Sequence, residues 1–278
     1  MPDSPAALRH SAFYRFTTLP DPAAAAATLR ELASPLKGSI VVAAEGVNGT
    51  VAGAPEAIAA FEVALQRPDV LGGALRGMAF RHSDCITEPF GRLKVSVKPA
   101  IVALGLPESL PAPDERDASH LSPRAWRELL KRDDVVVLDN RNHFEYRLGH
   151  FRGAVDPQVH NFRDFADWVR ERAPAWRAAG RPVAMYCTGG IRCDKTAPWL
   201  RGLGLDVWQL DGGILNYFGQ LPDAGDDWQG ECFVFDNRVA LDTGLRETPT
   251  TPEQVFDPAH PDEAWRLQRA RRLDAAGD

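Results

Sequence analysis

Residues 183–200 follow the order of a strand, a glycine-containing loop and a helix. The apolar run from Val183 to Tyr186 is typical of a buried strand, and residues 194–200 favour a helix. The loop between them is Cys187-Thr188-Gly189-Gly190-Ile191-Arg192-Cys193. A strand that passes through a short turn into a helix is typical of a sheet covered by helices. This segment therefore predicts an α/β fold with a cysteine at the tip of a strand.

The position of Cys187 favours a thiolate. The two glycines let the backbone turn its amides inward, and the start of the next helix adds the positive end of a dipole. Both conditions lower the pKa of a thiol. We expect Arg192 to fold over the loop and to add a fixed positive charge. The prediction is that Cys187 is a nucleophile in an anion-binding loop, whose lining residues are Thr188, Gly189, Gly190 and Ile191.

The length of the loop indicates the size of the anion. Cys187 and Arg192 enclose four residues, whereas cysteine-dependent phosphatases place five residues between the two. A smaller ring suits a sulfur-sized anion better than a tetrahedral phosphate. A lone cysteine after a strand is more often a small buried apolar residue than a nucleophile. The glycine pair, the arginine and the second cysteine together favour the nucleophile.

Length and composition restrict the class of protein. A chain of 278 residues is long enough for two modest domains. It contains no apolar run of membrane-spanning length, and its start lacks the pattern of a signal peptide. Its four cysteines include no CxxC pair and are too few for a disulfide scaffold. We therefore expect a cytoplasmic protein, in a reducing compartment where a thiolate stays usable.

The net charge of −6 is not that of a typical nucleic-acid-binding protein. Basic residues nevertheless gather between positions 81 and 98, where the chain contains Arg81, His82, Arg92, Lys94 and Lys98. They indicate either a local basic surface or the solvated face of a strand, and the sequence alone does not separate these two interpretations.

The first hundred residues alternate between strand and helix patterns. Strands are expected at 11–19, at 39–44 with a partner from residue 50, at 79–83 and at 94–104, and helices at 21–32 and 55–66. The Asn48-Gly49 dipeptide between two of these strands favours a tight turn. The resulting βαββαβ-like order predicts a ferredoxin-like (acylphosphatase-like) α+β domain over residues 1–106.

The rest of the chain predicts a second domain of parallel α/β type. Prolines 107, 111 and 113 indicate a linker over residues 107–120. Ser122 is a candidate N-cap for a helix that starts with Pro123. Strands are expected at 134–139, 183–186 and 207–210, with an amphipathic helix at 161–179. The predicted domain covers residues 121–225, and residues 226–278 form a short C-terminal extension.

Several motifs resemble those of the rhodanese family. The rhodanese pattern of Asp-x-Arg, then Glu, then Gly-His-Ile-x-Gly-Ala is similar to the segments 137–142, 144–146 and 149–154. The loop from Cys187 to Arg192 resembles the rhodanese active-site loop, and Leu210-Asp211-Gly212-Gly213 resembles the turn that follows it. The resemblance implies a rhodanese-like fold for the second domain.

Longer segments narrow the resemblance to one subfamily, the rhodanese-domain tRNA uridine(34) hydroxylases. These segments are Ala43 to Thr50, Asn140-Arg141-Asn142, the loop from Cys187 to Cys193, and Glu231 to Asp236. The resemblance covers most of residues 11–240. It implies oxygen-dependent formation of 5-hydroxyuridine at the wobble position of tRNA, with O2 as co-substrate. Candidate contacts to the anticodon region are then Arg81, Arg92, Lys94 and Lys98.

The resemblance also suggests roles for individual residues. Cys187 would act as a thiolate or as a persulfide carrier, and Arg192 would stabilise its sulfur. Cys193 either resolves an oxidised Cys187 as a disulfide or faces the interior of the helix. Asp139 and Arg141 are expected to form a structural ion pair beneath the loop. Glu145 and His150 are expected to have similar supporting roles, and a general-base role for His150 is the less favoured alternative.

No cofactor or metal site is identified from the sequence. There is no dinucleotide-binding or Walker glycine motif, and Cys85 and Cys232 are too dispersed to indicate a metal centre. Oxygen normally needs a metal, a flavin or a radical in order to react with a closed-shell base. The residues therefore do not explain how O2 would be activated.

Two other functions compete with hydroxylation. A sulfurtransferase would pass sulfane sulfur from Cys187 to a small thiophile, although such an enzyme does not need the N-terminal domain. A non-catalytic protein-binding module would not need the intact cysteine and arginine. The chain also departs from the subfamily, because many members have a cysteine-rich C-terminal extension, whereas this chain ends in an Arg-rich helical stretch, residues 263–273.

Overall fold

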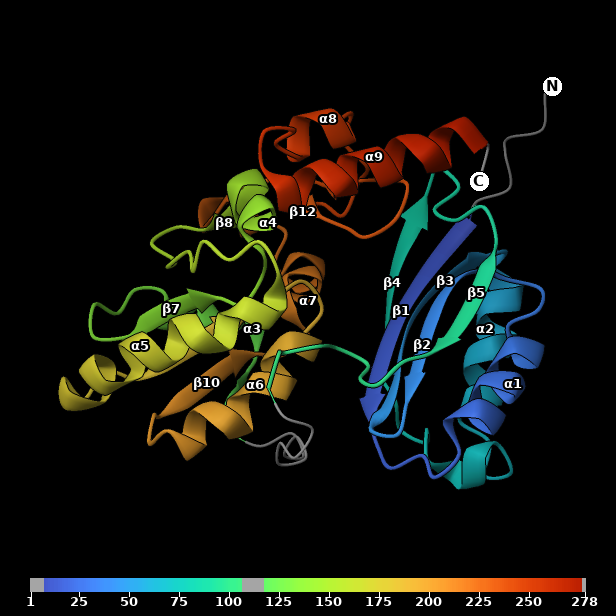
Figure 1. The fold of residues 1–278 in the computed structure, drawn as a ribbon, viewed down its shortest axis with the longest axis horizontal. Helices are drawn as coiled ribbons and strands as arrows, with labels where there is room; N and C mark the ends of the chain where they lie inside the picture. The colour runs from blue at the N-terminus through green and yellow to red at the C-terminus, as the bar shows by residue number, and fades with distance from the viewer. Residues whose placement is uncertain (1–7, 107–117, 277–278) are drawn as a thin grey trace. The chain divides into compact units, whose positions relative to one another are not determined.

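The computed structural model describes residues 8–106 and 118–276. The chain divides into two compact units, which are described separately below (Figure 1). The first unit contains the chain up to Ile101 with the segments Phe235–Arg238 and Leu273–Asp278. The second unit contains Val102–Val234 and Val239–Arg272. The predicted linker is mostly outside the described residues, because residues 107–117 are not among them.

The first unit is a five-stranded sheet with strand order β4-β1-β3-β2-β5. Its elements are β1 (Leu8–Phe16), α1 (Pro22–Leu32), β2 (Lys37–Ala43), β3 (Gly46–Gly53), α2 (Pro55–Leu65), the 3-10 turn η1 (Leu71–Gly73), β4 (Phe80–Cys85) and β5 (Leu93–Val97). The pairs β1–β3, β1–β4 and β2–β3 are antiparallel, and β2–β5 is parallel. This arrangement confirms the predicted ferredoxin-like domain. The predicted turn at Asn48-Gly49 is wrong, because both residues lie within β3 and the turn from β2 is at Ala44 and Glu45.

The prediction of a strand over residues 94–104 is wrong at its carboxyl end. Strand β5 ends at Val97, the amide of Lys98 still donates to the Val42 carbonyl, and the chain bends at Pro99. Proline has no N–H to donate to a strand ladder. The amide of Ile101 instead donates to Glu45 Oε1 at 2.9 Å. Residues 102–106 belong to the second unit, where Leu104 is buried in the core, so the structural boundary lies at residue 101 and not at 106.

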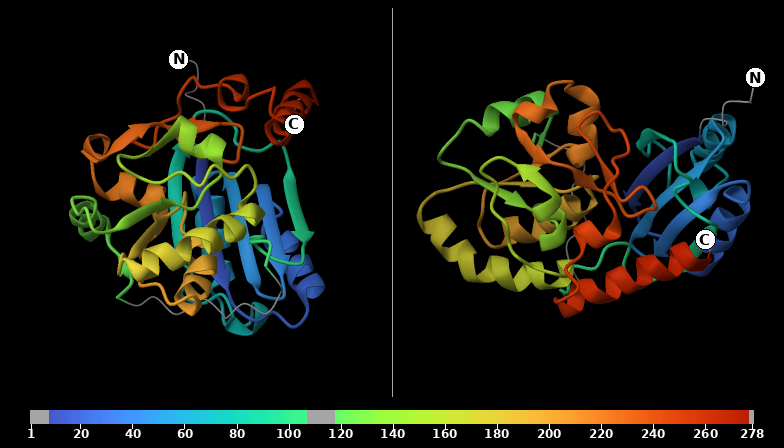
Figure 2. Two further views of the ribbon diagram at one scale, coloured as in Figure 1. Left: turned by 60° about the vertical axis from the view of Figure 1, so that its left-hand side comes forward. Right: turned by 90° about the horizontal axis from the view of Figure 1, so that it is seen from above.

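One face of this sheet is covered by α1 and α2 (Figures 1 and 2). Asp21 caps α1 through a hydrogen bond from the amide of Ala24, and prolines start both helices. Alternate residues of the strands pack against the helices, as strand geometry requires. The buried members of this core include Phe13, Ile40, Val42, Val47, Val51, Leu29, Ile58 and Phe61.

A short segment from late in the chain completes the first unit. Asp236 and Arg238 form a buried ion pair of 2.7 Å within this unit, and Arg238 also donates to the Ser83 hydroxyl at 2.7 Å. The ion pair lies beside His10, whose pKa falls to about 4 because of burial and then the charge of Arg238. The predicted C-terminal extension, 226–278, is therefore not a separate body, because Phe235–Arg238 belongs to the first unit.

The second unit has a four-stranded parallel sheet with strand order β6-β10-β9-β7. Its strands are β6 (His120–Leu121), β7 (Val136–Asp139), β9 (Val183–Tyr186) and β10 (Val207–Leu210). Its helices before residue 221 are α3 (Pro123–Leu129), α4 (His143–Leu148), α5 (Phe165–Ala178), α6 (Ile191–Gly202) and α7 (Gly213–Gln220), with the 3-10 turn η2 (Phe162–Asp164) ahead of α5. The parallel sheet confirms the predicted α/β fold.

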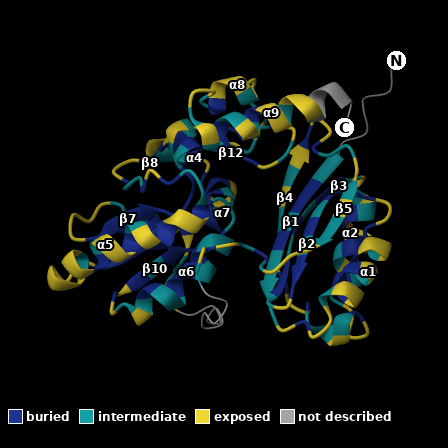
Figure 3. Cartoon of the chain, viewed as in Figure 1, coloured by how far each residue is buried: buried dark blue, intermediate teal, exposed yellow. Residues whose placement is uncertain are grey.

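Both faces of this sheet are covered. Every residue of β7 and β9 is buried, and Figure 3 shows β7 in dark blue. One core contains buried residues of α5 and α6, including Val169 and Leu200, and the other contains residues of α3 and α7, including Trp126 and Tyr217. The predicted N-cap is confirmed, since the Ser122 hydroxyl accepts from the amide of Ala125. The predicted helix over 161–179 forms as η2 followed by α5.

Smaller elements surround the parallel sheet. They are β8 (Gly149–Phe151), which pairs with β11 (Trp228–Gly230), β12 (Cys232–Phe233), which pairs with β13 (Ala240–Leu241), the 3-10 turn η3 (Ala224–Asp226), and the helices α8 (Pro252–Val255) and α9 (Pro261–Ala276). The Arg-rich stretch predicted to be helical lies in α9. Across residues 8–106 and 118–276, no helix has the length and apolarity needed to cross a membrane.

The start of α9 is held by a buried carboxylate. Glu263 is fully buried and accepts hydrogen bonds from Arg147 at 2.7 Å, from the amide of Asp257 at 2.7 Å and from His160 at 3.2 Å. Arg266 of the same helix lies over the ring of Phe144 and donates to Asn161 at 3.1 Å. At least one arginine of this stretch is thus engaged within the fold.

Candidate active site

Cys187 lies directly after β9, the strand between β7 and β10 in the second unit. The loop turns sharply, because Gly190 has a φ of 102°, a value that favours glycine. Helix α6 then begins at Ile191. The sequence-predicted order of strand, loop and helix is confirmed, with Thr188 and Gly189 half-buried on the loop.

The backbone of the loop is fixed by the next helix. The amides of Ile214 and Leu215, in the first turn of α7, donate to the carbonyls of Cys187 and Thr188 at 3.0 and 3.1 Å. This close approach needs a glycine at Gly213, since a Cβ there would lie 2.4 Å from the Cys187 carbonyl oxygen. The sequence indicated Gly213 only as part of a turn that resembles the rhodanese family. Its role in holding the loop was not predicted, although the pair Gly212-Gly213 after β10 indicated a tight turn at this place.

Cys187 is buried, with 1% of the residue's surface exposed, yet the pKa of its thiol is lowered to about 7. Burial is the largest influence and raises the pKa. A hydrogen bond with the Cys193 thiol, the charge of Arg192 and backbone amides of the loop outweigh it. The Gly190 amide lies 3.1 Å from the sulfur as a donor. The side chain predicted to be the nucleophile therefore has the electrostatics of a reactive thiol.

Cys193 is fully buried in the first turns of α6. Burial, together with the hydrogen bond with Cys187, raises the pKa of its thiol well above the usual value. The amide of Asn140 lies 3.9 Å from the Cys193 sulfur and donates to the Thr196 hydroxyl at 2.8 Å. Cys193 thus stays protonated and faces Cys187 while it is also buried at the base of α6.

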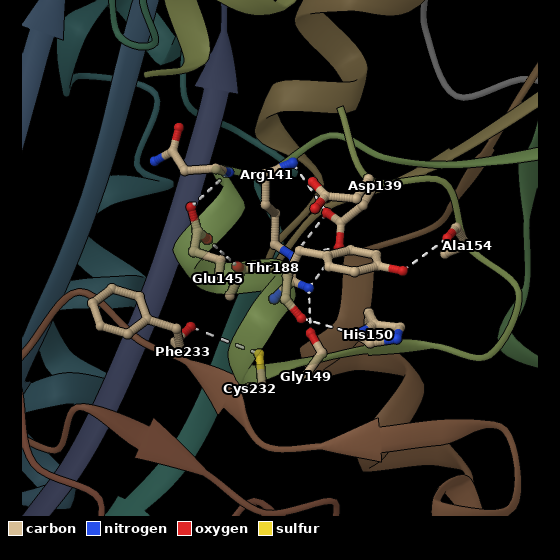
Figure 4. A network of polar contacts seen from close by, with 12 residues as sticks. Asp139, Arg141, Glu145, Gly149, His150, Ala154, Thr188, Cys232 and Phe233 are labelled. Carbon is tan, nitrogen blue, oxygen red and sulfur yellow. Dashed lines mark hydrogen bonds and ion pairs between the residues drawn. The ribbon is translucent and has the colours of Figure 1, made fainter. Parts of the chain in front are cut away.

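Arg192 supplies the positive charge expected near Cys187 and has a buried partner of its own. Its guanidinium forms an ion pair of 3.0 Å with Glu145, a fully buried carboxylate on α4. The Thr188 hydroxyl is oriented toward the same carboxylate at 3.5 Å (Figure 4). The capping box of α4 holds Glu145 in place, because its side chain also accepts from the Asn142 amide. Glu145 therefore positions the cation whose charge acts on Cys187.

Asp139 and Arg141 form a fully buried ion pair, with contacts of 2.7 and 2.9 Å. Arg141 also donates to the Gly149 carbonyl at 2.6 Å, so it ties the end of β7 to β8 (Figure 4). The contacts of this pair are those expected of a structural ion pair.

His150 stacks on Tyr146 with ring centroids 3.9 Å apart and lies 2.9 Å from the Tyr146 carbonyl through Nδ1. Those contacts are structural and give His150 no acid–base partner in the loop.

The remaining thiols have other surroundings. Cys232, on β12, is fully buried, and burial raises the pKa of its thiol to about 12 despite the opposing charge of Arg141. Cys85 is buried in the first unit on β4. Within residues 8–106 and 118–276, no three His, Cys, Asp or Glu side chains converge in a way that could hold a metal ion.

The predicted basic contacts lie in the first unit. Arg81 is on β4 and Lys94 is on β5, while Arg92 and Lys98 flank β5 at its two ends. The structure thus gathers residues 187–193 with Glu145 in one unit and the four basic residues around two edge strands of the other.

Comparison with known proteins gives two domain matches and relatives that align with most of the chain. Residues 8–101 match the model of the UPF0176 acylphosphatase like domain, and residues 122–220 match that of the Rhodanese-like domain. A protein of Nitrobacter winogradskyi named tRNA uridine(34) hydroxylase is 44% identical over 87% of this chain and 94% of its own length. Proteins with the same name from Bradyrhizobium diazoefficiens and Deinococcus radiodurans are also 44% identical, over 89% and 85% of this chain and 96% and 77% of their own lengths.

Proposed function

The chain belongs to the tRNA uridine(34) hydroxylase family, and from that premise we propose that it hydroxylates uridine 34 of tRNA to 5-hydroxyuridine with O2. The observation that supports a role for the loop is the Cys187 thiol, whose pKa of about 7 leaves much of it ionised at neutral pH. A wobble base that reaches this thiol has to leave its stack in the anticodon loop. The reducing cytoplasm, where tRNA and usable thiols occur together, is the proposed setting.

We propose that Cys187 takes up the second oxygen atom of O2. The C5–H of the uracil ring becomes C5–OH, and the Cys187 thiol becomes a sulfenic acid. One oxygen atom goes to each product, and the hydrogen atoms of the base and of the thiol end in the two hydroxyl groups. The thiol supplies the two electrons that the reduction of the second oxygen atom requires. Thiolates are the form of cysteine that is oxidised along this route.

Cys193 then restores the site as a resolving thiol. Its sulfur attacks the Cys187 sulfenic acid, water leaves, and a disulfide between residues 187 and 193 remains. A cellular dithiol reduces that disulfide by thiol–disulfide exchange. The hydrogen bond between the two thiols supports this role, because it requires the sulfur atoms to lie close together. Arg192 and the loop amides stabilise the anionic sulfur before oxidation.

The test is nucleoside mass spectrometry of bulk tRNA from a strain that lacks the gene. The strain is complemented with the wild type, with Cys187→Ser or with Cys232→Ser as a matched thiol control. We expect 5-hydroxyuridine and its derivatives with the wild type and the control, and none with Cys187→Ser. Hydroxylation by Cys187→Ser at the level of the wild type would show that the chemistry lies elsewhere.

The same thiol also favours a second candidate function, sulfur transfer. A buried thiolate in a loop with four residues between cysteine and arginine is also suited to carry a persulfide, in which case the chain is a sulfurtransferase. If no complemented strain changes its tRNA, rates of sulfur transfer from thiosulfate to cyanide by the wild type and Cys187→Ser decide this alternative. A rate that depends on Cys187 supports it, and equal background rates reject it.

A further inference from the structure

The sheet of the first unit has two unlike faces. Its apolar face packs against α1 and α2, and strand alternation places the intervening residues on the opposite face. We call this opposite face the polar face. Its strand residues away from the Asp236–Arg238 pair are Ala12, Tyr14, Phe16, Ser39, Val41, Asn48, Thr50, Arg81, Lys94 and Ser96. Small polar and aromatic residues make up most of this set, and it lacks the aliphatic cluster of the other face.

The pairing register aligns these residues in rows. Arg81 pairs with Ala12, Ala12 with Thr50, Thr50 with Ser39, and Ser39 with Lys94. This row therefore crosses all five strands and has a cation at each end and small side chains between them. At about 4.8 Å between neighbouring strands, the two cations are separated by roughly 19 Å.

The charged side chains in this set of strand residues, Arg81 and Lys94, are both cations. The five strands contain a single carboxylate, Asp84, which pairs with Arg9 in the register and lies 4.0 Å from it. Both lie on the helix-covered face. Arg9 is two residues from Ser11 and so shares its face of β1, and the Ser11 hydroxyl donates to Glu62 of α2. Away from the Asp236–Arg238 pair, the polar face is thus cationic in a chain whose net charge is −6, which favours an anionic partner.

Arg81 supplies a second indication of a ligand. Its Nε atom is buried and has no hydrogen-bond acceptor among residues 8–106 and 118–276. A buried donor without an acceptor costs free energy, so it favours a ligand that provides one. A phosphate oxygen is a suitable acceptor because a guanidinium binds it through charge and fork geometry.

Aromatic rings lie on the next rows of the same face. Tyr14, half-buried on the inner strand β1, contacts the ring of Phe16 edge to face, with centroids 6.2 Å apart. Its row continues through Asn48, which pairs with it across β3. An aromatic ring on a sheet, flanked by polar side chains and by cations at the edges, is suited to stack unpaired bases while the cations hold the backbone.

We propose that the polar face binds unpaired nucleotides of the anticodon loop, with Tyr14 stacking on a base and Arg81 and Lys94 binding phosphates. The proposal rests on the proposed function, since it assigns a surface to the same tRNA substrate. It also gives a common location to the basic residues found in the sequence, because Arg92 and Lys98 flank the strand that contains Lys94.

The test is fluorescence anisotropy of a labelled anticodon stem–loop RNA with the full chain. The variants are Tyr14→Leu, Tyr14→Phe and the double variant Arg81→Gln/Lys94→Gln. Arg67→Gln is the matched charge control, because Arg67 follows α2 and is exposed beside Asp69. Thermal melts of each variant confirm that it is folded.

We expect Tyr14→Leu to weaken binding about 5- to 100-fold and Tyr14→Phe to bind within about threefold of the wild type, because stacking needs only the ring. The double variant should weaken binding and lower the slope of log affinity against log salt by about 1.4, the value for two contacts to single-stranded phosphates. Arg67→Gln should bind as the wild type does.

Three results would overturn the proposal. If folded Tyr14→Leu and the folded double variant both bind RNA with the affinity of the wild type, the RNA binds elsewhere. The proposed function still stands in that case if the wild type forms 5-hydroxyuridine. Equal affinity of the wild type for the stem–loop and for a fully paired duplex would exclude base stacking. Competition by an acidic peptide as strong as that by RNA of equal charge would indicate a protein partner. If the wild type neither binds RNA nor forms 5-hydroxyuridine, the proposed function itself fails.

Discussion

Cys187 and Cys232 are both buried thiols of the same unit, yet their pKa values shift in opposite directions. Burial raises the pKa of Cys232 to about 12, and the positive charge of Arg141 only partly opposes it. Burial acts on Cys187 in the same sense, but the Cys193 thiol, Arg192 and the loop amides lower its pKa to about 7. Burial alone therefore raises the pKa of a thiol in this unit. The Cys193 thiol, the charge of Arg192 and the loop amides reverse that effect at Cys187.

The largest expected effect is on the reactivity of the two thiols. At pH 7.5 we expect a small alkylating agent to modify Cys187 at least about 100-fold faster than Cys232, because the thiolate is the nucleophile. The rate at Cys187 should rise about tenfold per pH unit below pH 7 and level off above it, since a lowered pKa means that deprotonation is nearly complete there. Peptide mass spectrometry over a pH series measures both sites. Equal rates, or a rate at Cys187 that still rises near pH 9, would contradict the comparison.

Removing the positive charge of Arg192 should raise the pKa of Cys187 toward that of Cys232. Arg192→Met keeps the apolar stem but leaves Glu145 buried without its ion-pair partner, so we expect a loss of about 3–5 kcal/mol in the free energy of unfolding. The pKa of Cys187 should rise in the same variant. The double variant Glu145→Gln/Arg192→Met should regain stability but keep the raised pKa. Urea denaturation and the alkylation profile measure the two effects, and an unchanged pKa in both variants would refute a role for Arg192.

The hydrogen bond from Cys193 also lowers the pKa of Cys187, and its loss should cost less stability than the loss of Arg192. Cys193→Ser keeps a donor, whereas Cys193→Ala removes it. A net hydrogen-bond contribution of about 0.5–1.5 kcal/mol corresponds to a rise of roughly one pH unit in the alanine variant. The serine variant should differ little from the wild type in its alkylation profile, although neither variant can form the disulfide. Identical profiles for alanine and serine would exclude the hydrogen bond as a cause.

The smallest effect is expected at Cys232. Cys232→Ser should hydroxylate tRNA within about twofold of the wild type, since Cys232 has no place in the proposed chemistry. The buried hydroxyl should cost about 1–3 kcal/mol of stability unless it finds a partner. Activity and a thermal melt, measured on the same preparation, test this prediction. A loss of activity without a loss of stability would show that Cys232 has a catalytic role, contrary to what its raised pKa indicates.

Local patterns explain which parts of the site could be predicted from the sequence. The apolar run before Cys187, the glycines after it and the cap at Ser122 act within a few residues, so their structures follow from short-range rules. The partner of Arg192 was not predicted, because Glu145 lies 47 residues away and is brought near by tertiary packing.

The same reason accounts for the errors in domain boundaries. Composition marked the prolines after residue 106, but the burial of Leu104 in the second core places the boundary earlier. The segment Phe235–Arg238 joins the first unit through contacts with Ser83, which is 155 residues from Arg238 in the chain. Neither contact leaves a periodic signal in the sequence.

The most direct test of a catalytic Cys187 is hydroxylation of purified tRNA under 18O2 with a dithiol reductant. Wild type, Cys187→Ser and Cys232→Ser would be assayed side by side, and the nucleosides analysed by mass spectrometry. We expect one atom of 18O in the 5-hydroxyuridine formed by the wild type and by Cys232→Ser, and no product with Cys187→Ser. Labelled product from Cys187→Ser at the wild-type rate would contradict this expectation.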